Sequence, residues 1–283
     1  MKVGLIGAGL MGSGLARLFA KAGWAVSVFD PDAAALDRLG AQLPAILRSQ
    51  LLADVVGEVD LVVESAPEKP ALKQSIFADL AAITRPATIL GTNSSVIPVG
   101  VVTEKLSDAD ARRAIGLHFW NPPDIIPLVE VIRGPRSGDE ALKTALGWMR
   151  EIGKDAVPVE KDAVPGNRMQ AALWREAIAL VEEGVCTPED VDLIVKRSFA
   201  LRLAAVGPLE NLDLIGLDLG ADIQRVVLPT LSRATEPSQE LTGRIARGEL
   251  GGKSGNGFYR GWTEEKLDAL RARLVAHVTS LLK

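Results

Sequence analysis

The stretch Gly7-Ala8-Gly9-Leu10-Met11-Gly12 decides the fold of this chain. It lies between a short apolar run, Val3 to Ile6, and a run with helical spacing from Met11 to about Ala22. This order predicts a strand, a tight glycine turn and a helix, whose free N–H groups and positive end would face a phosphate. The first glycine allows the turn, the second lets the backbone approach a pyrophosphate, and the third lets helix and strand pack closely. The predicted phosphate-binding residues are Gly7, Gly9, Leu10, Met11 and Gly12.

An acidic residue follows the next predicted strand. That strand, Ala25 to Phe29, ends in Asp30, which lies 18 residues after Gly12. A carboxylate at this place accepts hydrogen bonds from a ribose diol and repels a 2′-phosphate, and no arginine follows it directly. The pattern therefore predicts NAD rather than NADP as the cofactor. The alternative, a glycine-rich turn in an unrelated α/β protein, is disfavoured because strand, helix and acid are all in place.

The composition limits the classes of protein that remain. The chain has 283 residues, of which 47% are hydrophobic, enough for one large domain or two ordinary ones. A net charge of −4 argues against a nucleic-acid partner, and no apolar run is long enough for a membrane helix. A single cysteine, Cys186, excludes an internal disulfide. We therefore expect a cytoplasmic protein with no signal peptide and no membrane partner.

Strands and helices alternate along the first 160 residues. This alternation predicts a Rossmann-type, doubly wound, mostly parallel sheet covered by helices on both faces, and a cofactor domain over residues 1–160. The further strands are expected at 61–64, 88–91, 114–118, 128–132 and 156–159, and the further helices at 33–39, 41–56 (interrupted at Pro44), 71–83 and 139–152.

The pattern changes at a probable linker, residues 161–166, and is helical beyond it. Helices are expected over 167–183, from a start at 187–190, over 209–231 and over 263–282. Helices that cannot cover all their own apolar surface suggest a partner copy. We therefore predict an all-α domain over residues 161–283 that contacts substrate and forms a homodimer.

The chain has only two histidines, and one of them lies at a strand end. His118 ends the strand 114–118, and in an open α/β sheet ligands bind outside the carboxyl ends of the strands. Glu130, twelve residues on in the next strand, could bond the far imidazole nitrogen and so orient a histidine that takes and returns a proton. A lone strand-end histidine is more often structural, but the dinucleotide fold shifts the balance to catalysis. We expect His277 to be solvated or at a dimer edge, and we expect no metal site.

Residues 116 to 133, GLHFWNPPDIIPLVEVIR, resemble the H-x-x-N-P…L-V-E-V stretch of the L-3-hydroxyacyl-CoA dehydrogenase family. The resemblance extends over nearly the full length of the chain. The other matching segments are residues 7–14 (GAGLMGSG), 64–73 (ESAPEKPALK), 93–95 (NSS), 181–184 (VEEG), 207–210 (GPLE) and 253–259 (KSGNGFY).

The resemblance implies roles for the matching residues. In that family the histidine removes the alcohol proton while hydride passes to NAD, and the glutamate orients it, which implies these roles for His118 and Glu130. Ser94 would bond the substrate oxygen, and Asn121 and Asn167 would line the same site.

Two further residues match a pair near the nicotinamide ribose, which implies cofactor binding by Glu68 and Lys73. Without the resemblance, these two residues could equally be an ordinary pair at a helix start. Ser94 could likewise be a helix cap before Pro98.

The implied activity is hydride transfer between NAD and the β-carbon alcohol or ketone of a 3-hydroxyacyl-CoA or a 3-hydroxy acid, as in fatty acid metabolism. In the fatty-acyl enzymes a long helical hairpin after the second strand helps to hold coenzyme A. Only about thirty residues separate Asp30 from Leu61 here, too few for that hairpin and a crossover helix.

Relatives that act on free acids, such as the gulonate and carnitine dehydrogenases and a dehydrogenase of pyridoxine breakdown, suggest an alternative. The substrate would then be a compact alcohol or hydroxy acid without coenzyme A. It could contact Trp120, Trp174, Arg175 and Arg202, which could equally be core tryptophans and surface arginines.

Two other interpretations rank lower. The related β-hydroxyacid dehydrogenases use a catalytic lysine on the first interdomain helix, but the matching helix here begins Asn167-Arg168-Met169-Gln170 and has no lysine there. A silent NAD-binding or structural relative has no need of a base, so an intact pair of His118 and Glu130 argues against it.

Overall fold

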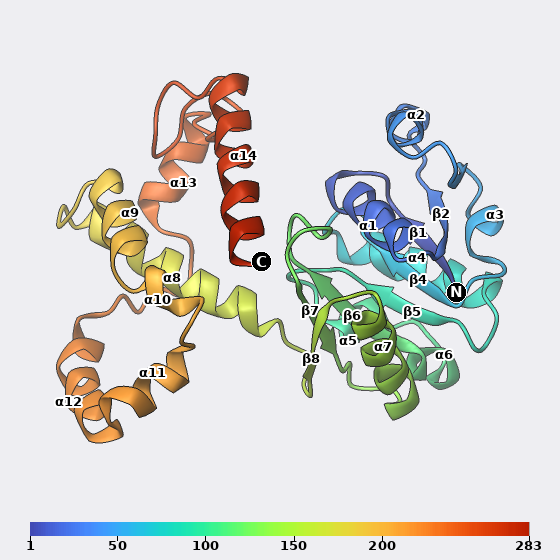
Figure 1. The fold of residues 1–283 in the computed structure, drawn as a ribbon, viewed down its shortest axis with the longest axis horizontal. Helices are drawn as coiled ribbons and strands as arrows, with labels where there is room; N and C mark the ends of the chain where they lie inside the picture. The colour runs from blue at the N-terminus through green and yellow to red at the C-terminus, as the bar shows by residue number, and fades with distance from the viewer. Residues whose placement is uncertain (283) are drawn as a thin grey trace. The chain divides into compact units, whose positions relative to one another are not determined.

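The structure, a computed structural model, describes residues 1–282. The chain divides into two compact units (Figure 1). The first unit is Met1–Pro165 together with the C-terminal residues from Val278, and the second unit is Gly166–His277.

The first unit contains one eight-stranded sheet with the order β3-β2-β1-β4-β5-β6-β7-β8. Every neighbouring pair is parallel except β6 and β7, which are antiparallel. The chain moves outward from β1 first in one direction and then in the other, so the order reverses between β1 and β4. This topology confirms the predicted Rossmann-type doubly wound sheet. The strands are β1 (Lys2–Ile6), β2 (Ala25–Phe29), β3 (Leu47–Ser49), β4 (Leu61–Glu64), β5 (Ile89–Thr92), β6 (Ala114–Phe119), β7 (Leu128–Ile132) and β8 (Asp155–Val159).

Helices cover both faces of this sheet, as Figure 1 shows. Two separate clusters of buried apolar residues lie between the helices and the strands. On one face the helices are α1 (Leu10–Lys21), α2 (Ala33–Gln42) and α7 (Asp139–Glu151). On the other face they are α3 (Leu52–Val56), α4 (Pro70–Ile83), α5 (Val99–Val102) and α6 (Asp108–Arg112).

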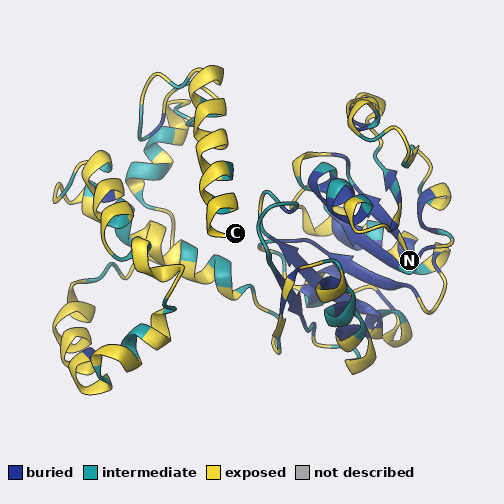
Figure 2. Cartoon of the chain, viewed as in Figure 1, coloured by how far each residue is buried: buried dark blue, intermediate teal, exposed yellow. Residues whose placement is uncertain are grey.

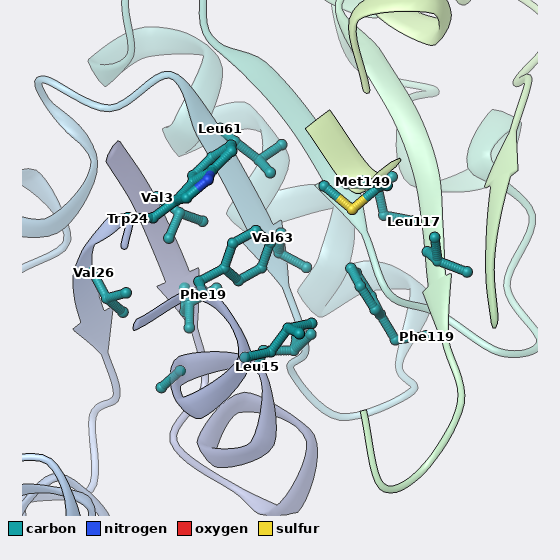
Figure 3. Close-up of a cluster of buried hydrophobic side chains, with 14 of the residues drawn as sticks. Val3, Leu15, Phe19, Trp24, Val26, Leu61, Val63, Leu117, Phe119 and Met149 are labelled. Atoms are coloured by element: carbon teal, nitrogen blue, oxygen red, sulfur yellow. The ribbon is translucent and has the colours of Figure 1, made fainter. Parts of the chain in front are cut away.

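Aromatic side chains join α1 to the strands within the larger cluster (Figure 3). Phe19 is fully buried, and its ring centroid lies 5.2 Å from that of Trp24 and 6.4 Å from that of Phe119. Phe119 is the last residue of β6. The glycine-turn helix and the histidine strand are thus packed into one rigid core.

The prediction of helix over residues 41–56 is wrong in part. Helix α2 ends at Gln42, Leu47–Ser49 forms the edge strand β3, which pairs in parallel with Ser27–Phe29, and helix resumes at Leu52–Val56. Three residues are too few to show a strand period, so the pairing partner rather than the local pattern decides the structure. The short helices α5 and α6 were likewise not apparent from the pattern.

The second unit contains helices and no strand among its described residues, which confirms the all-α prediction. Its predicted start signal at residues 187–190 is present, because Thr187 accepts a hydrogen bond from the Asp190 N–H at 3.2 Å. The helices from α8 onward are α8 (Pro165–Glu182), α9 (Pro188–Arg197), α10 (Ala200–Leu203), α11 (Pro208–Ile215), α12 (Leu217–Val227), a 3-10 turn (Leu228–Thr230), α13 (Gln239–Ala246) and α14 (Glu264–Leu281).

The prediction of one helix over residues 209–231 is wrong. The backbone breaks at Gly216, whose φ of +95° lies in the region that glycine adopts at no steric cost. Two shorter helices result, α11 and α12.

Burial differs sharply between the two units (Figure 2). Among the described residues of the second unit, Val191 is the one apolar side chain that is buried, whereas the first unit contains both core clusters. Within residues 1–282, no helix combines the length and apolar character that spanning a bilayer requires.

Candidate active site

The strand register aligns the carboxyl ends of five strands at one edge of the sheet. Ile6 of β1 pairs with Phe29 of β2 and with Glu64 of β4, and Glu64 pairs in turn with Thr92 of β5. Thr92 pairs with Gly116 of β6, two residues before His118. The glycine turn, Asp30, the serines after β5 and His118 therefore all belong to this edge, where ligands of such sheets bind.

The glycine turn has the geometry that a pyrophosphate requires. Gly7 has a φ of +104°, and a Cβ on Gly12 would overlap the Gly7 carbonyl oxygen, so α1 packs against the turn only because both residues are glycine. A Cβ on Gly9 would meet no atom within 4 Å, so the space above this residue is open. Helix α1 begins at Leu10 with no side-chain cap and no acid in its first turn, which leaves its amino end available to an anion.

Asp30 stabilises the same turn. Its Oδ2 accepts the Ala8 N–H at 2.7 Å and its Oδ1 accepts the Asp32 N–H at 2.8 Å. Each carboxylate oxygen has a second lone pair, so the group can still accept hydrogen bonds from a ribose diol. The Ser65 hydroxyl, one residue beyond β4, is buried without a hydrogen-bond partner, and the Ser65 carbonyl packs against Gly7. An unsatisfied buried hydroxyl beside an open glycine turn fits a site built for a polar cofactor.

His118 and Glu130 face each other across the antiparallel pair of β6 and β7. The imidazole Nδ1 lies 2.7 Å from Glu130 Oε2, and the two residues are 3% and 4% exposed. A carboxylate can only accept hydrogen bonds, so Nδ1 holds the proton and Nε2 is left as an acceptor. The structure thus brings together the two residues that the sequence singled out, with the imidazole in the tautomer that a proton acceptor needs.

The two serines after β5 have different contacts. Ser94 is 4% exposed, and its hydroxyl donates to Glu68 Oε2 at 2.8 Å and accepts the Ile97 N–H at 2.8 Å. The Ser95 hydroxyl lies 3.1 Å from His118 Nε2. The serine whose hydroxyl lies beside the imidazole is therefore Ser95, the neighbour of the predicted Ser94.

Lys73 of the predicted pair with Glu68 has a nearer carboxylate partner. Lys73 is 1% exposed, and its Nζ lies 2.7 Å from Oε1 of the fully buried Glu64 but 3.9 Å from Glu68 Oε2. Glu64 Oε2 in turn accepts the Thr92 hydroxyl proton at 2.8 Å. Lys73 therefore neutralises a buried carboxylate under the strand ends.

Asn121 is exposed in the loop between β6 and β7 and is joined to Pro122 by a cis peptide bond. Buried Lys154 stabilises this loop, because its Nζ donates to the Pro123 and Ile126 carbonyl oxygens, each at 2.6 Å. Burial lowers the pKa of Lys154. No pattern in the sequence pointed to Lys154, which lies before β8.

The same loop is also fixed to α1. Asp124 accepts a hydrogen bond from Arg17 Nε at 2.8 Å, and a Cβ on Gly14 would lie 2.6 Å from Pro123 Cγ, so only glycine admits the loop there. Burial raises the pKa of Asp124, but the hydrogen bonds from Arg17 and the backbone, together with the charges of Arg17 and Lys154, hold the pKa below its usual range.

Trp120 lies against the histidine, with ring centroids 5.5 Å apart. Its indole N–H is buried and has no hydrogen-bond partner. Among residues 1–282, no group of three or more His, Cys, Asp or Glu side chains is placed to hold a metal ion.

The remaining predicted residues belong to the second unit. Asn167 lies in the first turn of α8 and is half-buried. Trp174 is 58% exposed and lines an apolar cavity of about 550 Å³ together with Trp262 and Phe258. Tyr259, on the same cavity, has a pKa raised to about 12 by burial and by its hydrogen bond to Asp192. Arg175 contacts Glu176 on its own helix, Arg202 is exposed on α10, and His277 is exposed on α14.

Comparison with known proteins covers both units. The family profile described as "3-hydroxyacyl-CoA dehydrogenase, NAD binding domain" matches residues 2–51 and 39–163, and that described as "3-hydroxyacyl-CoA dehydrogenase, C-terminal domain" matches residues 165–261. The chain is 32% identical to 5-formyl-3-hydroxy-2-methylpyridine 4-carboxylate 5-dehydrogenase of Mesorhizobium japonicum, over 99% of this chain and 98% of the relative. It is 36% identical to a probable 3-hydroxybutyryl-CoA dehydrogenase of Deinococcus radiodurans, over 92% and 100%.

Solved structures give the same relationship. A crystal structure of the 5-formyl-3-hydroxy-2-methylpyridine 4-carboxylic acid 5-dehydrogenase, described as an NAD+-dependent dismutase, superposes with a TM-score of 0.93 at 29% identity, over 99% of this chain and 96% of that one. The crystal structure of a 3-hydroxyacyl-CoA dehydrogenase of Archaeoglobus fulgidus superposes with a TM-score of 0.74 at 32% identity, over 100% of this chain and 99% of that one. The chain therefore belongs to the 3-hydroxyacyl-CoA dehydrogenase family, and it is an NAD-dependent oxidoreductase that acts on CH–OH donors.

Proposed function

We propose that His118 Nε2 is the base that takes the proton of the substrate hydroxyl. The observation behind this proposal is the 2.7 Å contact between His118 Nδ1 and Glu130, which leaves Nε2 as an acceptor at the carboxyl edge of the sheet. As the imidazole gains the proton it becomes cationic, and the buried Glu130 carboxylate stabilises that charge. NAD, when bound, supplies the hydride acceptor. In the reverse direction His118 returns the proton to the new alkoxide oxygen.

We propose Ser95 rather than Ser94 as the serine that bonds the substrate oxygen. Its hydroxyl is 3.1 Å from His118 Nε2, so an oxygen near both groups would be fixed in line with the base. The Ser94 hydroxyl is already engaged with Glu68 and with the Ile97 N–H. Asn121 lies in the adjoining loop and would contact the substrate, and we keep Asn167 as a further predicted contact.

We propose that the dinucleotide lies on the turn from Gly7 to Gly12, with Leu10 and Met11 at its helix start and Asp30 on the adenosine ribose. The open space over Gly9 and the unsatisfied Ser65 hydroxyl support this placement. Residues 1–160 would then be the cofactor domain. Residues 161–283 would be the substrate and dimerisation domain, of which residue 283 lies outside the described residues.

The substrate we propose is a compact carboxylated alcohol or aldehyde without coenzyme A. Between β2 and β4 the chain forms only α2, β3 and α3, with no long helical hairpin. The relative from Mesorhizobium japonicum is named for such a compact acid, and an L-carnitine dehydrogenase of Streptomyces coelicolor is 33% identical over 76% of this chain and 73% of the relative. A substrate of this kind would separate the enzyme from fatty acid metabolism.

We also propose that the chain acts as a cytoplasmic homodimer formed through the second unit. Many apolar side chains of that unit are exposed, including Leu209 and Leu214, which are 74% and 75% exposed. Exposure of so many apolar side chains to water is unfavourable, and the helices of a second copy would bury them.

Measurement of NADH formation tests the function directly. The panel should contain free 3-hydroxy acids, carnitine, carboxylated aromatic alcohols and aldehydes, and the CoA esters of the same 3-hydroxy acids. We expect turnover of a free acid with kcat/KM well above that of its CoA ester. The opposite order would reject the compact substrate while leaving the dehydrogenase class intact.

The variant His118→Gln tests the role of the histidine, because glutamine keeps a hydrogen-bonding side chain of similar reach but cannot act as the base. We expect kcat to fall by about 10²- to 10⁴-fold, the usual contribution of a general base, with little change in the Kd for NADH. Full activity of His118→Gln would reject the proposed chemistry.

A further inference from the structure

A second carboxylate, that of Glu68, binds the turn formed by residues 93–97 after β5, which we call the serine turn. The hydroxyl of Ser95 in this turn lies beside the histidine. Glu68 lies in the short connection between β4 and α4, and its side chain is 38% exposed. Its Oε2 accepts the Ser94 hydroxyl proton at 2.8 Å and its Oε1 accepts the Ser95 N–H at 2.9 Å. Both oxygens of the carboxylate thus accept hydrogen bonds from adjacent residues of one turn, and hydrogen bonds to an ionised acceptor are stronger than neutral ones.

The nearby lysine, Lys73, lies closer to another carboxylate. Lys73 Nζ is 2.7 Å from Glu64 and donates a further hydrogen bond to the Ala66 carbonyl at 3.0 Å, whereas its distance to Glu68 is 3.9 Å. The buried cation is therefore matched by Glu64. Glu68 is left to accept the hydrogen bonds of the serine turn.

The serine turn transmits this contact to the imidazole. Ser94 uses its hydroxyl inside the turn, as donor to Glu68 and as acceptor from the Ile97 N–H. Asn93 Oδ1 accepts the Phe119 N–H at 2.8 Å, which ties the start of the turn to the residue after His118. With both ends held, the Ser95 hydroxyl stays 3.1 Å from His118 Nε2.

We infer that Glu68 is a positioning residue that holds Ser95 against His118 Nε2, an inference that rests on the proposed function of those two residues. Loss of the carboxylate leaves the Ser95 N–H and the Ser94 hydroxyl without their acceptor, so the turn relaxes and the Ser95 hydroxyl leaves its place beside the base. Displacement of a positioned group by about 1 Å suffices to cost a large factor in rate.

A double-mutant cycle on the full-length enzyme tests this inference. The variants are Glu68→Ala, Ser95→Ala and the double variant, measured for kcat, KM and the Kd of NADH by fluorescence titration. We expect kcat to fall about tenfold or more in each single variant, as is usual when a group that orients a site residue is removed. The double variant should be no slower than Ser95→Ala, because Glu68 acts only through that serine. The Kd for NADH should change less than about twofold.

Two further variants make the result decisive. Glu68→Gln keeps one oxygen acceptor and should give an intermediate kcat, which guards against an alanine variant that folds poorly. Glu58→Gln, an exposed glutamate between α3 and β4, is the matched control and should behave as wild type.

Several results would overturn the inference. Effects that multiply in the double variant, or a Glu68→Ala variant with weakened NADH binding and normal kcat, would make Glu68 a cofactor contact instead. An unchanged kcat in Ser95→Ala would also overturn the inference, because Glu68 could not then affect kcat through that serine. If His118→Gln is inactive while Glu68→Ala is fully active, only this inference fails. If His118→Gln is active, the proposed function fails with it.

Discussion

In the first unit, strands β4, β5 and β6 have every residue buried, whereas in the second unit helices α8, α11 and α14 have no buried residue at all. Figure 2 shows the same contrast across the two sets of elements. Both units are rich in apolar residues, so the difference lies in what those residues contact.

This contrast separates two sources of stability. The first unit has two apolar clusters on the two faces of its sheet, and burial of apolar area is the main term that stabilises a fold. The second unit has one buried apolar side chain among its described residues, so its helices need a further surface to pack against. The 2.7 Å contact between His118 and Glu130 belongs to the unit that contains both apolar clusters, whose packed strands fix the positions of site side chains.

The largest expected effect on stability comes from the first unit's core. Replacement of Phe19 by alanine removes a fully buried ring that contacts Trp24 and Phe119, and should cost about 3–5 kcal/mol of unfolding free energy. Urea denaturation measures it, and the loss should not depend on protein concentration. Leu51→Ala, at a leucine that is 66% exposed, is the control and should cost little. If Phe19→Ala lowers the free energy of unfolding no more than the control does, the apolar core is not the source of the first unit's stability.

Much of the first unit could be predicted from the sequence because its signals are local or periodic. The glycine turn, Asp30 and the alternation of strands and helices each have a short-range pattern. The pairing of His118 with Glu130 could be predicted because two consecutive strands placed the residues in register. The resemblance to the family added roles that no spacing could supply.

The remainder depended on contacts far apart in the sequence. Ser94 and Ser95 are adjacent and chemically identical, and the Ser94 hydroxyl bonds Glu68, some 26 residues earlier, while the Ser95 hydroxyl lies beside the imidazole. Two glutamates lie within reach of Lys73, and only the burial of Glu64 decides its partner. The break at Gly216 is a single left-handed residue inside an otherwise continuous apolar pattern.

The next largest effect should appear in the second unit. Replacing Leu214, which is 75% exposed on α11, by glutamate would place an unpaired charge in the proposed dimer interface. We expect the dimer dissociation constant to rise about tenfold or more, since a buried anchor residue contributes about 2 kcal/mol. Sedimentation velocity at several concentrations measures it, with Leu51→Glu in the first unit as the matched control. A chain that is monomeric before mutation, or equally dimeric after it, would contradict the proposed interface.

A smaller effect is expected at the loop that contains Asn121. Lys154→Met keeps an unbranched side chain, one atom shorter, but removes both hydrogen bonds to the Pro123 and Ile126 carbonyls. We expect a loss of about 1–3 kcal/mol in stability, because two buried acceptors lose their donor. Because that loop adjoins the histidine, KM for the substrate should rise more than KM for NAD. Equal changes in the two constants would show that the loop does not position the substrate.

The smallest effect concerns the contact between that loop and α1. Burial raises the pKa of Asp124, but the hydrogen bonds from Arg17 and the backbone and the charges of Arg17 and Lys154 together hold it below its ordinary value of 3.8. The ionised carboxyl therefore stabilises the fold at pH values above 3.8, and this stabilisation is lost as the pH falls through the folded-state pKa. Because Arg17 is 40% exposed, solvent screens the pair and Asp124→Asn should cost less than about 1 kcal/mol near neutral pH. The difference in melting temperature between wild type and Asp124→Asn should narrow below pH 3.8, whereas the control Asp79→Asn, at an exposed residue on α4, should show none at any pH. A difference that persists unchanged in acid would mean that the carboxylate charge is not what fixes the loop to α1.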